Sequence, residues 1–401
     1  MFTTFQEMLK SAPWRMGQLR GFRAFSIDNL GYDSDIYYGF LGQEYPDFTF
    51  AAGPFFQWLL PLSKTVIFDS YQQIQTYFFA ENKKERTLNF RTENRLHFFS
   101  KKFYSQTGFN YDNSRRRLSP ELALNVREEQ IAWHGLMAWQ LSRRTILAWQ
   151  LRALRYNYLN ASYEGISLDQ ELNRREMYAD TFFYLQPAAK YRLFLNGQVG
   201  FFNFNHAASK IRNSHSYSVM AGLEFVPAPS SNRPTWQGGV SLGYSLLDPD
   251  SSLYKKASGF VGQGILITNL TSWLSIREYF SRGFNISIYS SLLHYLSTAY
   301  GGGLIFHLSR TITASPNLLF GKTEYPLEPE SMTTAPAYKY HNYSVNLGIL
   351  LGKEWRIDLK GSIYRRILLP SGLKINRYFV GFTLNFGSVP GENLSLMPSL
   401  I

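Results

Sequence analysis

The stretch EWRIDLKGSIYRR, Glu354–Arg366, decides the fold class of this chain. Apolar or small residues alternate in it with polar and charged ones. One set is Trp355, Ile357, Leu359, Gly361 and Ile363, and the other is Arg356, Asp358, Lys360, Ser362 and Tyr364. Successive side chains of a β-strand point to opposite faces, so a period of two predicts a strand with one apolar and one charged face.

The same alternation returns along the whole chain. It is clear in TLNFRTENRLHFF (87–99), TILAWQLRAL (145–154) and YRLFLNGQVGFF (191–202). Connections alternate as well, because short ones such as PLSK (61–64) separate long polar ones such as 112–129. Short turns at one rim and long loops at the other predict a single up-and-down antiparallel β-barrel. We count about eighteen strands between Arg20 and Phe386, within a range of about sixteen to twenty. The stretch from Ser272 to Ser309 is the least certain, because it contains either an outer loop or an additional strand.

Composition agrees with an all-β membrane protein. Of 401 residues, 45% are apolar and 17% aromatic, and only 17% are charged, compared with about 25% in an average protein. The chain has no cysteine, which excludes disulfides, thiolate metal sites and covalently attached haem. No apolar run approaches the roughly 20 residues of a membrane helix. The first residues show no basic start and apolar core of a secretory signal.

The width of such a barrel decides which face is inside. Barrels of about 16 to 18 strands enclose an aqueous channel, so the polar face must line the lumen and the apolar face must contact lipid. The residues expected to line the lumen are Arg91, Arg95, Arg152, Arg192, Arg277, Arg356, Lys360, Arg366, Tyr71, Tyr77, Tyr178 and Tyr364. The residues expected to face lipid are Leu147, Trp149, Leu151, Ile357, Leu359, Phe382 and Phe386.

Further features fit an integral multi-pass barrel of a Gram-negative outer membrane. Tryptophans near the predicted strand ends are expected to form interfacial belts; they are Trp58, Trp133, Trp139, Trp236, Trp273 and Trp355. We expect three parts, namely a short N-terminal periplasmic segment (1–17), the barrel (18–388) and a short C-terminal tail (389–401).

Four stretches carry a resemblance to a known family. They are FSIDNLGYDSDIYYG (Phe25–Gly39), PLSKT (Pro61–Thr65), HLSRTITASPNLLFGKTEYP (His307–Pro326) and the closing RYFVGFTLNFG (Arg377–Gly387). The chain resembles, in pattern across residues 18 to 388, a family of outer-membrane β-barrel porins associated with exopolysaccharide export. The resemblance implies a channel that passes a secreted polysaccharide, with a periplasmic polysaccharide-export protein docked beneath it.

The excess of basic residues on the predicted luminal face favours an acidic polymer, because rings of basic side chains favour anions. Pairing of these residues with Asp69, Glu93, Asp180, Glu224 and Asp358 across neighbouring strands is an equally simple explanation. Basic residues in the short turns indicate either a docking surface or contacts with lipid head groups. They are Lys64, Lys101, Lys102, Arg143, Arg144, Lys190, Arg310 and Lys353. Expected partners are thus outer-membrane lipid, an anionic polysaccharide and the export protein, and no nucleic acid.

Two other functions stay open. The chain is compatible with a general or anion-selective diffusion porin, in which the loop Asp112–Glu129 would fold inward, and with a sleeve around a separate cytochrome. We expect no enzyme activity, cofactor or metal. Ser241 lies in a G-x-S-x-G match but mid-strand, away from the strand-to-helix turn that the mechanism requires. The histidines lack metal-ligand spacing, and His97 and His134 are expected to be solvated in the lumen.

Overall fold

The computed structural model describes residues 9–10, 12–37, 44–116, 121, 124–159, 161–163, 165–225, 235–289, 292–325, 337–352, 354–369 and 371–387. Eighteen long strands make up the wall. They are β2 (Leu19–Asp33), β3 (Asp47–Pro61), β4 (Val66–Phe79), β5 (Thr87–Phe99), β6 (Phe103–Arg116), β7 (Val126–Gln140), β8 (Thr145–Tyr158), β11 (Arg174–Ala188), β12 (Tyr191–Phe204), β13 (Ser214–Phe225), β14 (Trp236–Pro249), β15 (Ala257–Asn269), β16 (Leu274–Ile286), β17 (His294–His307), β18 (Ile312–Glu324), β19 (Ala337–Leu351), β20 (Trp355–Leu369) and β21 (Lys374–Gly387).

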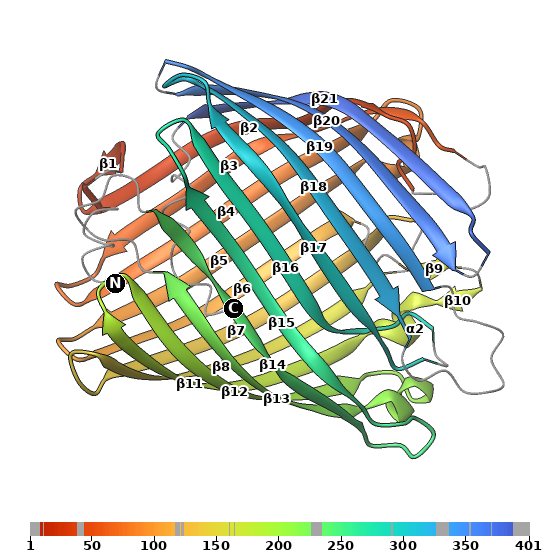
Figure 1. Cartoon of the computed structure of the whole chain (residues 1–401), viewed down its shortest axis with the longest axis horizontal. Helices are drawn as coiled ribbons and strands as arrows, with labels where there is room; N and C mark the ends of the chain where they lie inside the picture. The colour runs from red at the N-terminus through yellow and green to blue at the C-terminus, as the bar shows by residue number, and fades with distance from the viewer. Residues whose placement is uncertain are drawn as a thin grey trace.

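Each of these strands pairs antiparallel with its neighbours along the chain, and β21 pairs with β2 to close the barrel (Figure 1). The predicted fold class and strand number are confirmed. The uncertain stretch from Ser272 to Ser309 contains β16 and β17 with a connection between them. None of the helices in the described part of the chain is long and apolar enough to cross a membrane.

Short elements sit at the rims. They are β1 (Trp14–Met16), which pairs with β2, and η1 (Lys83–Glu85), β9 (Ser162–Tyr163), β10 (Ile166–Ser167), α2 (Leu168–Leu172) and η2 (Ala208–Arg212). Short connections such as 100–102 and 189–190 lie at one rim, and η1, α2 and η2 lie in longer connections at the other. Because outer-membrane barrels have short periplasmic turns and long outer loops, we call these ends the inner rim and the outer rim.

The two faces of the wall differ as the alternation predicts. Tyr158 of β8 packs against Ile288, which follows β16 on a distant part of the wall, so the face that carries Tyr158 is the interior. On the opposite face, large apolar side chains are exposed, for example Val380 at 68% and Leu151 at 47%. Apolar side chains gain nothing from water, so a belt of this kind requires lipid around the barrel.

The strand register places every residue expected to face lipid on this outer face. Leu147, Trp149 and Leu151 lie beside Phe183, Thr181 and Ala179 of β11, while Ile357 and Leu359 lie beside Leu384 and Phe382 of β21, and Phe386 lies beside Trp355. Trp133 differs from the expectation, because it stands in the middle of β7 and not at a strand end. Its indole Nε1–H donates to Thr107 Oγ1 (3.1 Å) on β6, which satisfies the polar atom away from the interface.

A bulge in β2 changes which residues face inward. Phe22 pairs with Gln57, but beyond the register shift at Asp28 it is the odd-numbered Gly31 and Asp33 that pair with Thr49 and Asp47 of the interior face. Asn29 takes up the extra residue with a positive φ of 51°. Bulges of this kind re-aim side chains at the end of a regular ladder.

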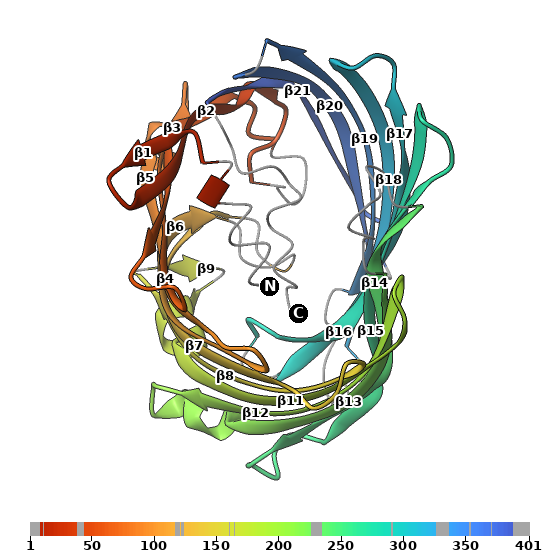
Figure 2. The same ribbon diagram turned by 90° about the vertical axis from the view of Figure 1, so that its left-hand side faces the viewer.

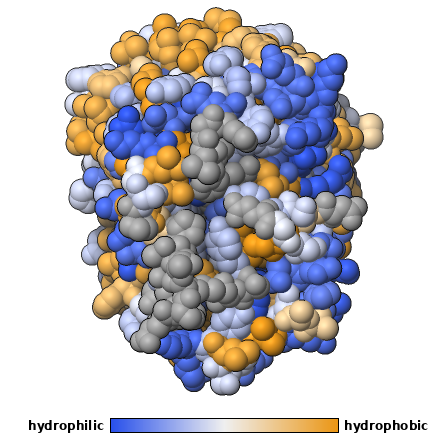
Figure 3. Space-filling model, turned by 90° about the vertical axis from the view of Figure 1, so that its right-hand side faces the viewer, coloured by the Kyte–Doolittle hydropathy of each residue, from blue (hydrophilic) through white to orange (hydrophobic). Residues whose placement is uncertain are grey.

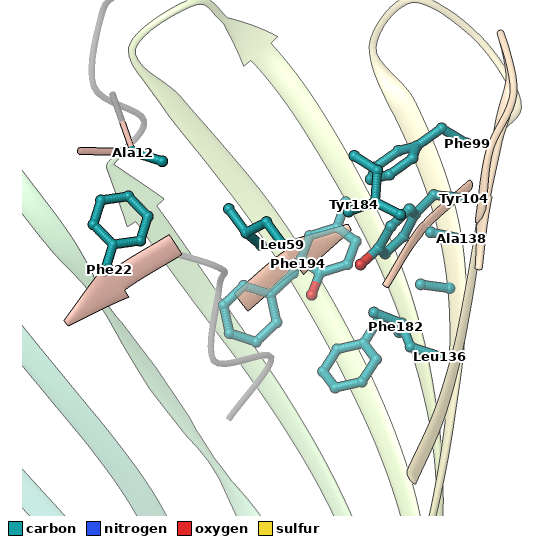
Figure 4. Close-up of a cluster of buried hydrophobic side chains, with 12 residues drawn as sticks. Ala12, Phe22, Leu59, Phe99, Tyr104, Leu136, Ala138, Phe182, Tyr184 and Phe194 are labelled. Atoms are coloured by element: carbon teal, nitrogen blue, oxygen red, sulfur yellow. The ribbon is translucent and has the colours of Figure 1, made fainter. Parts of the chain in front are cut away.

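Apolar side chains also gather inside the barrel near the inner rim. Phe22, Leu59, Phe99, Phe182 and Phe194 belong to this inner collar, which Figure 4 shows with its neighbours from several strands. Ala12, which precedes β1, is buried against the collar at 2% exposure. Leu9 and Ala12, which precede β1, therefore pack into the interior at the inner end.

Candidate functional site: the barrel interior

All residues expected to line the lumen lie on the interior face, but most of the arginines are paired with acids. Arg95 lies 3.4 Å from Asp69 and 3.3 Å from Glu93. Arg152 donates to Asp180 (3.1 Å) on the neighbouring strand. The other pairs are Arg91 with Glu93, Arg192 with Glu224 and Arg356 with Asp358. Pairing across neighbouring strands, and between residues two apart on one strand, thus neutralises most of the predicted basic surface.

The remaining three basic residues differ from one another. Arg366 is 1% exposed and its guanidinium lies 4.3 Å from the ring centroid of Tyr338. Arg277 is exposed between Ile267 and Gly303. Among the described residues, neither Arg277 nor Lys360 takes part in an ion pair. Both of these cations lie on the interior face, where a passing anion can reach them.

The predicted tyrosines combine flat rings with polar ends. Tyr178 lies under the Arg152 guanidinium at 4.9 Å and its hydroxyl donates to Glu176 (2.8 Å). Tyr364 stacks on Tyr340 with the ring centroids 5.8 Å apart. Tyr71 and Tyr77 lie on β4, where the Tyr71 hydroxyl donates to Gln73 (2.9 Å). Such rings offer apolar surface that stays compatible with water.

The two histidines expected in the lumen, His97 and His134, differ in burial. His134 Nε2 lies 2.9 Å from Gln106 Nε2 and is only partly buried. His97 is wrong as a solvated side chain, because it is fully buried at 0% exposure and its Nδ1 lies 2.9 Å from the Tyr104 hydroxyl. Its ring stacks with Phe99 and Tyr104 of the inner collar, which shields it from water.

A polar assembly at the outer rim was not expected from the sequence. Glu121 is 2% exposed and its carboxylate accepts hydrogen bonds from Ser287 Oγ (2.8 Å), the Ile288 backbone N–H (2.8 Å) and the Tyr325 hydroxyl. Arg212, which is fully buried, donates to the backbone oxygen of Ser287 (2.5 Å) and to Glu171 (3.2 Å). We call Glu121, Arg212, Ser287, Ile288 and Tyr325 the outer cap.

The outer cap depends on a strand pair that leaves the wall. β16 pairs with β15 only from Ser275 to Arg282, whereas its pairing with β17 continues to Ile286. Figure 2 shows the outer part of β16 inside the ring formed by the other strands. The loop after β16 thereby reaches α2 and β8 across the lumen. The loop Asp112–Glu129, which the sequence offered as an inward-folding loop, contributes Glu121 to this cap.

Burial sets the charge preferences within the cap. Burial raises the pKa of Glu121 above its ordinary value and outweighs the hydrogen bonds that it accepts. Burial also lowers the pKa of Arg212, in spite of the neighbouring Glu171. Burial therefore disfavours the charged forms of both Glu121 and Arg212. Loss of a hydrogen-bond partner of either residue should destabilise the cap.

A water-accessible recess lies on the other side of the interior. It has a volume of about 590 Å³ and is bounded by β2 to β6 and by β19 to β21. Figure 3 looks onto the outer end of the barrel, where hydrophilic residues gather around the rim.

The interior contains no arrangement typical of catalysis at the position that the sequence singled out. Ser241 stands within β14 and its Oγ lies 3.5 Å from the backbone oxygen of Gln263. Within the described ranges, His, Asp and Glu residues form no group of three or more that could hold a metal ion.

Comparisons with known proteins address the fold. No protein-family model and no curated protein matches this sequence. Among solved structures, OccAB4 of Acinetobacter baumannii matches with a TM-score of 0.51 and 12% identity, covering 93% of this chain and 99% of that chain. The FrpB iron transporter of Neisseria meningitidis (F5-1 variant, apoprotein form) matches with a TM-score of 0.50 and 10% identity, covering 92% of this chain and 64% of that chain.

At these identities the likeness concerns the fold alone. It agrees with a closed barrel of 18 strands whose outer face is apolar and whose inner face carries ion pairs and water-accessible space. A barrel with an apolar outside and a polar inside is stable only in a bilayer. The chain is therefore an integral β-barrel of the outer membrane.

Proposed function

We propose that this barrel is a channel through which a hydrophilic polysaccharide is secreted across the outer membrane. The observation that carries the proposal is the interior surface itself, where tyrosine rings alternate with ion pairs whose charges cancel. Tyr71 and Tyr178 stand beside Arg91 and Arg152 on the inward faces of their strands. A sugar chain can pass over flat rings and exchange hydrogen bonds with paired charges.

The inner rim supports a periplasmic partner in the same proposal. Its short connections expose a set of basic side chains, which are Lys64, Lys101, Lys102, Arg143, Arg144, Lys190 and Arg310; Lys353 lies outside the described residues. A ring of cations around a channel mouth attracts an acidic surface. The export protein that the family resemblance implies would dock at this rim, and the barrel itself would carry out no chemistry.

A second candidate is a diffusion porin for small hydrophilic solutes. The outer cap favours it, because a hairpin folded into the lumen narrows the path. The two functions differ in what the cap must do. A polysaccharide can pass only when the cap moves aside, whereas small solutes pass beside it.

A reversible crosslink separates the two functions. Glu121 and Ser287 are in hydrogen-bond contact and the chain has no cysteine, so the double variant Glu121→Cys/Ser287→Cys can lock the cap when oxidised. The cells should lack the chromosomal gene and express either this variant or one of the two single-cysteine variants as controls. Surface polysaccharide and the uptake rate of a small sugar are measured with and without reductant.

For the secretion channel, we expect surface polysaccharide to fall in the oxidised double variant alone and to recover with reductant. For the diffusion porin, secretion stays unchanged under all conditions. Unchanged surface polysaccharide in the deletion strain itself contradicts the proposal directly.

A further inference from the structure

The recess in the interior is lined by Lys360 of β20, Phe379 of β21 and Thr49 of β3. Across the wall, Lys360 pairs with Gly381, Gly381 pairs with Gly31, and Gly31 pairs with Thr49. A Cβ built on Gly31 would lie 2.1 Å from the backbone oxygen of Val380, so this position excludes any larger residue. The Phe379 ring lies against Gly381 and is the apolar part of the lining.

Polar side chains line the recess on the interior face. Asn342, Ser344, Asn346 and Ser362 line the recess from β19 and β20, and Tyr77 lines it from β4. The side-chain oxygens of Asn342 and Asn346 are buried and have no hydrogen-bond partner. The hydroxyls of Ser344, Ser362 and Tyr77, which also line the recess, can donate and accept hydrogen bonds, as the hydroxyl groups of a sugar require.

The charges of the recess cancel except at one residue. Arg377 donates to Asp33 (2.7 Å), Arg115 to Glu85 (2.9 Å) and Arg116 to Glu128 (3.0 Å). Lys360 has no ion pair within the part of the chain that the structure describes.

The carboxylates nearest to Lys360 along the strands accept hydrogen bonds from other residues. Asp358 accepts hydrogen bonds from Arg356 (2.9 Å) and from Asn346 (3.1 Å). Asp28 accepts from Ser26 (2.9 Å) and Gln75 (2.9 Å). The ammonium group of Lys360 therefore stays available to an external anion.

We propose that this recess is a binding site for one carboxylate-bearing sugar unit, whose carboxylate contacts Lys360. The ring hydroxyls face the amides and hydroxyls of β19 and β20. A volume of about 590 Å³ is within the range of about 300 to 1,000 Å³ that is typical of small-molecule sites. The inference rests on the proposed function, since it assigns a substrate class to the same channel.

Equilibrium binding tests the site on the whole barrel. Titration calorimetry of the purified protein in detergent micelles uses trigalacturonate as the anionic ligand and maltotriose as the neutral one. Loss of a hydrogen bond to a charged group costs enough to weaken binding by about tenfold or more. We expect Lys360→Gln to weaken trigalacturonate binding by this factor and to leave maltotriose binding unchanged. Lys360→Arg should retain binding of the anionic ligand.

Arg277→Gln is the matched control, because Arg277 is another interior cation that makes no ion pair with a described residue, and it lies outside the recess. It should bind trigalacturonate like the wild type. The site is refuted when wild-type protein fails to bind trigalacturonate, when Lys360→Gln binds it normally, or when Arg277→Gln weakens it equally. Secretion in the deletion strain is an independent readout, so the binding site and the proposed function can fail separately.

Discussion

Removal of the Glu121 carboxylate should open the outer end of the barrel. Glu121 ties together the loop after β6, the loop after β16 and the end of β18 by accepting hydrogen bonds from Ser287, Ile288 and Tyr325. In Glu121→Ala these three donors lose their acceptor at a site closed to water. The closed arrangement of the cap should therefore lose stability relative to an arrangement in which the donors meet water.

The contacts give the size of the effect. At about 1 kcal/mol for each net hydrogen bond, the loss of three bonds destabilises the closed cap by about 3 kcal/mol. Such a change shifts the ratio of closed to open molecules by about two orders of magnitude. Glu121→Gln keeps an acceptor oxygen and should cause a smaller shift. Replacement of Arg212 by Ala should act in the same direction, because it frees the backbone oxygen of Ser287.

Single-channel recording in planar bilayers measures this shift as open probability. Glu224→Gln serves as control, since it breaks the Arg192–Glu224 wall pair without contact to the cap, and should leave open probability unchanged. A Glu121→Ala channel that opens no more often than the wild type, while it retains the folded barrel, refutes the role of the cap.

Three further predictions concern the wall, the lumen and the cap. Leu359→Arg on the lipid face should destabilise the barrel by about 2–4 kcal/mol, whereas Ser362→Arg on the interior face should have little effect, as denaturant unfolding in lipid vesicles can measure. The wild-type channel should be only weakly ion-selective, and Asp180→Asn should shift the reversal potential in a salt gradient towards anions, because it leaves Arg152 without its acid. The cap should be most stable at low pH and weaken as the pH rises through the pKa of Glu121, which burial raises; open probability should then increase with pH in the wild type and stay flat in Glu121→Gln.

Local chemistry was sufficient to predict the strands and their two faces. The alternation in Glu354–Arg366 sets Leu359 against lipid and Lys360 towards water wherever the strand is placed, because the period of two is a property of the extended backbone. The short connections and the closing strand further predicted antiparallel order and a strand number that the structure confirms. The exopolysaccharide family stays a resemblance, on which the proposed function draws.

The contacts between side chains inside the lumen could not be predicted from this alternation. No sequence pattern indicated that Glu121 and Arg212 are buried, and the sequence left open whether Arg152 is a free cation or the partner of an acid on a neighbouring strand. Closure of the barrel brings Glu121 to Ser287, 166 residues away, and strand register brings Arg152 to Asp180. The bulge at Asn29, which no pattern revealed, decides that Gly31 and not Leu30 stands beside Thr49 and Gly381 on the interior face.

The sequence by itself therefore determined which side of each strand meets lipid and which meets water, since transfer between these solvents depends on each side chain alone. Only the tertiary structure decided which charges cancel and where the lumen narrows. Those outcomes depend on distances between residues far apart in the chain, and ring closure fixes these distances while the alternation of side chains does not.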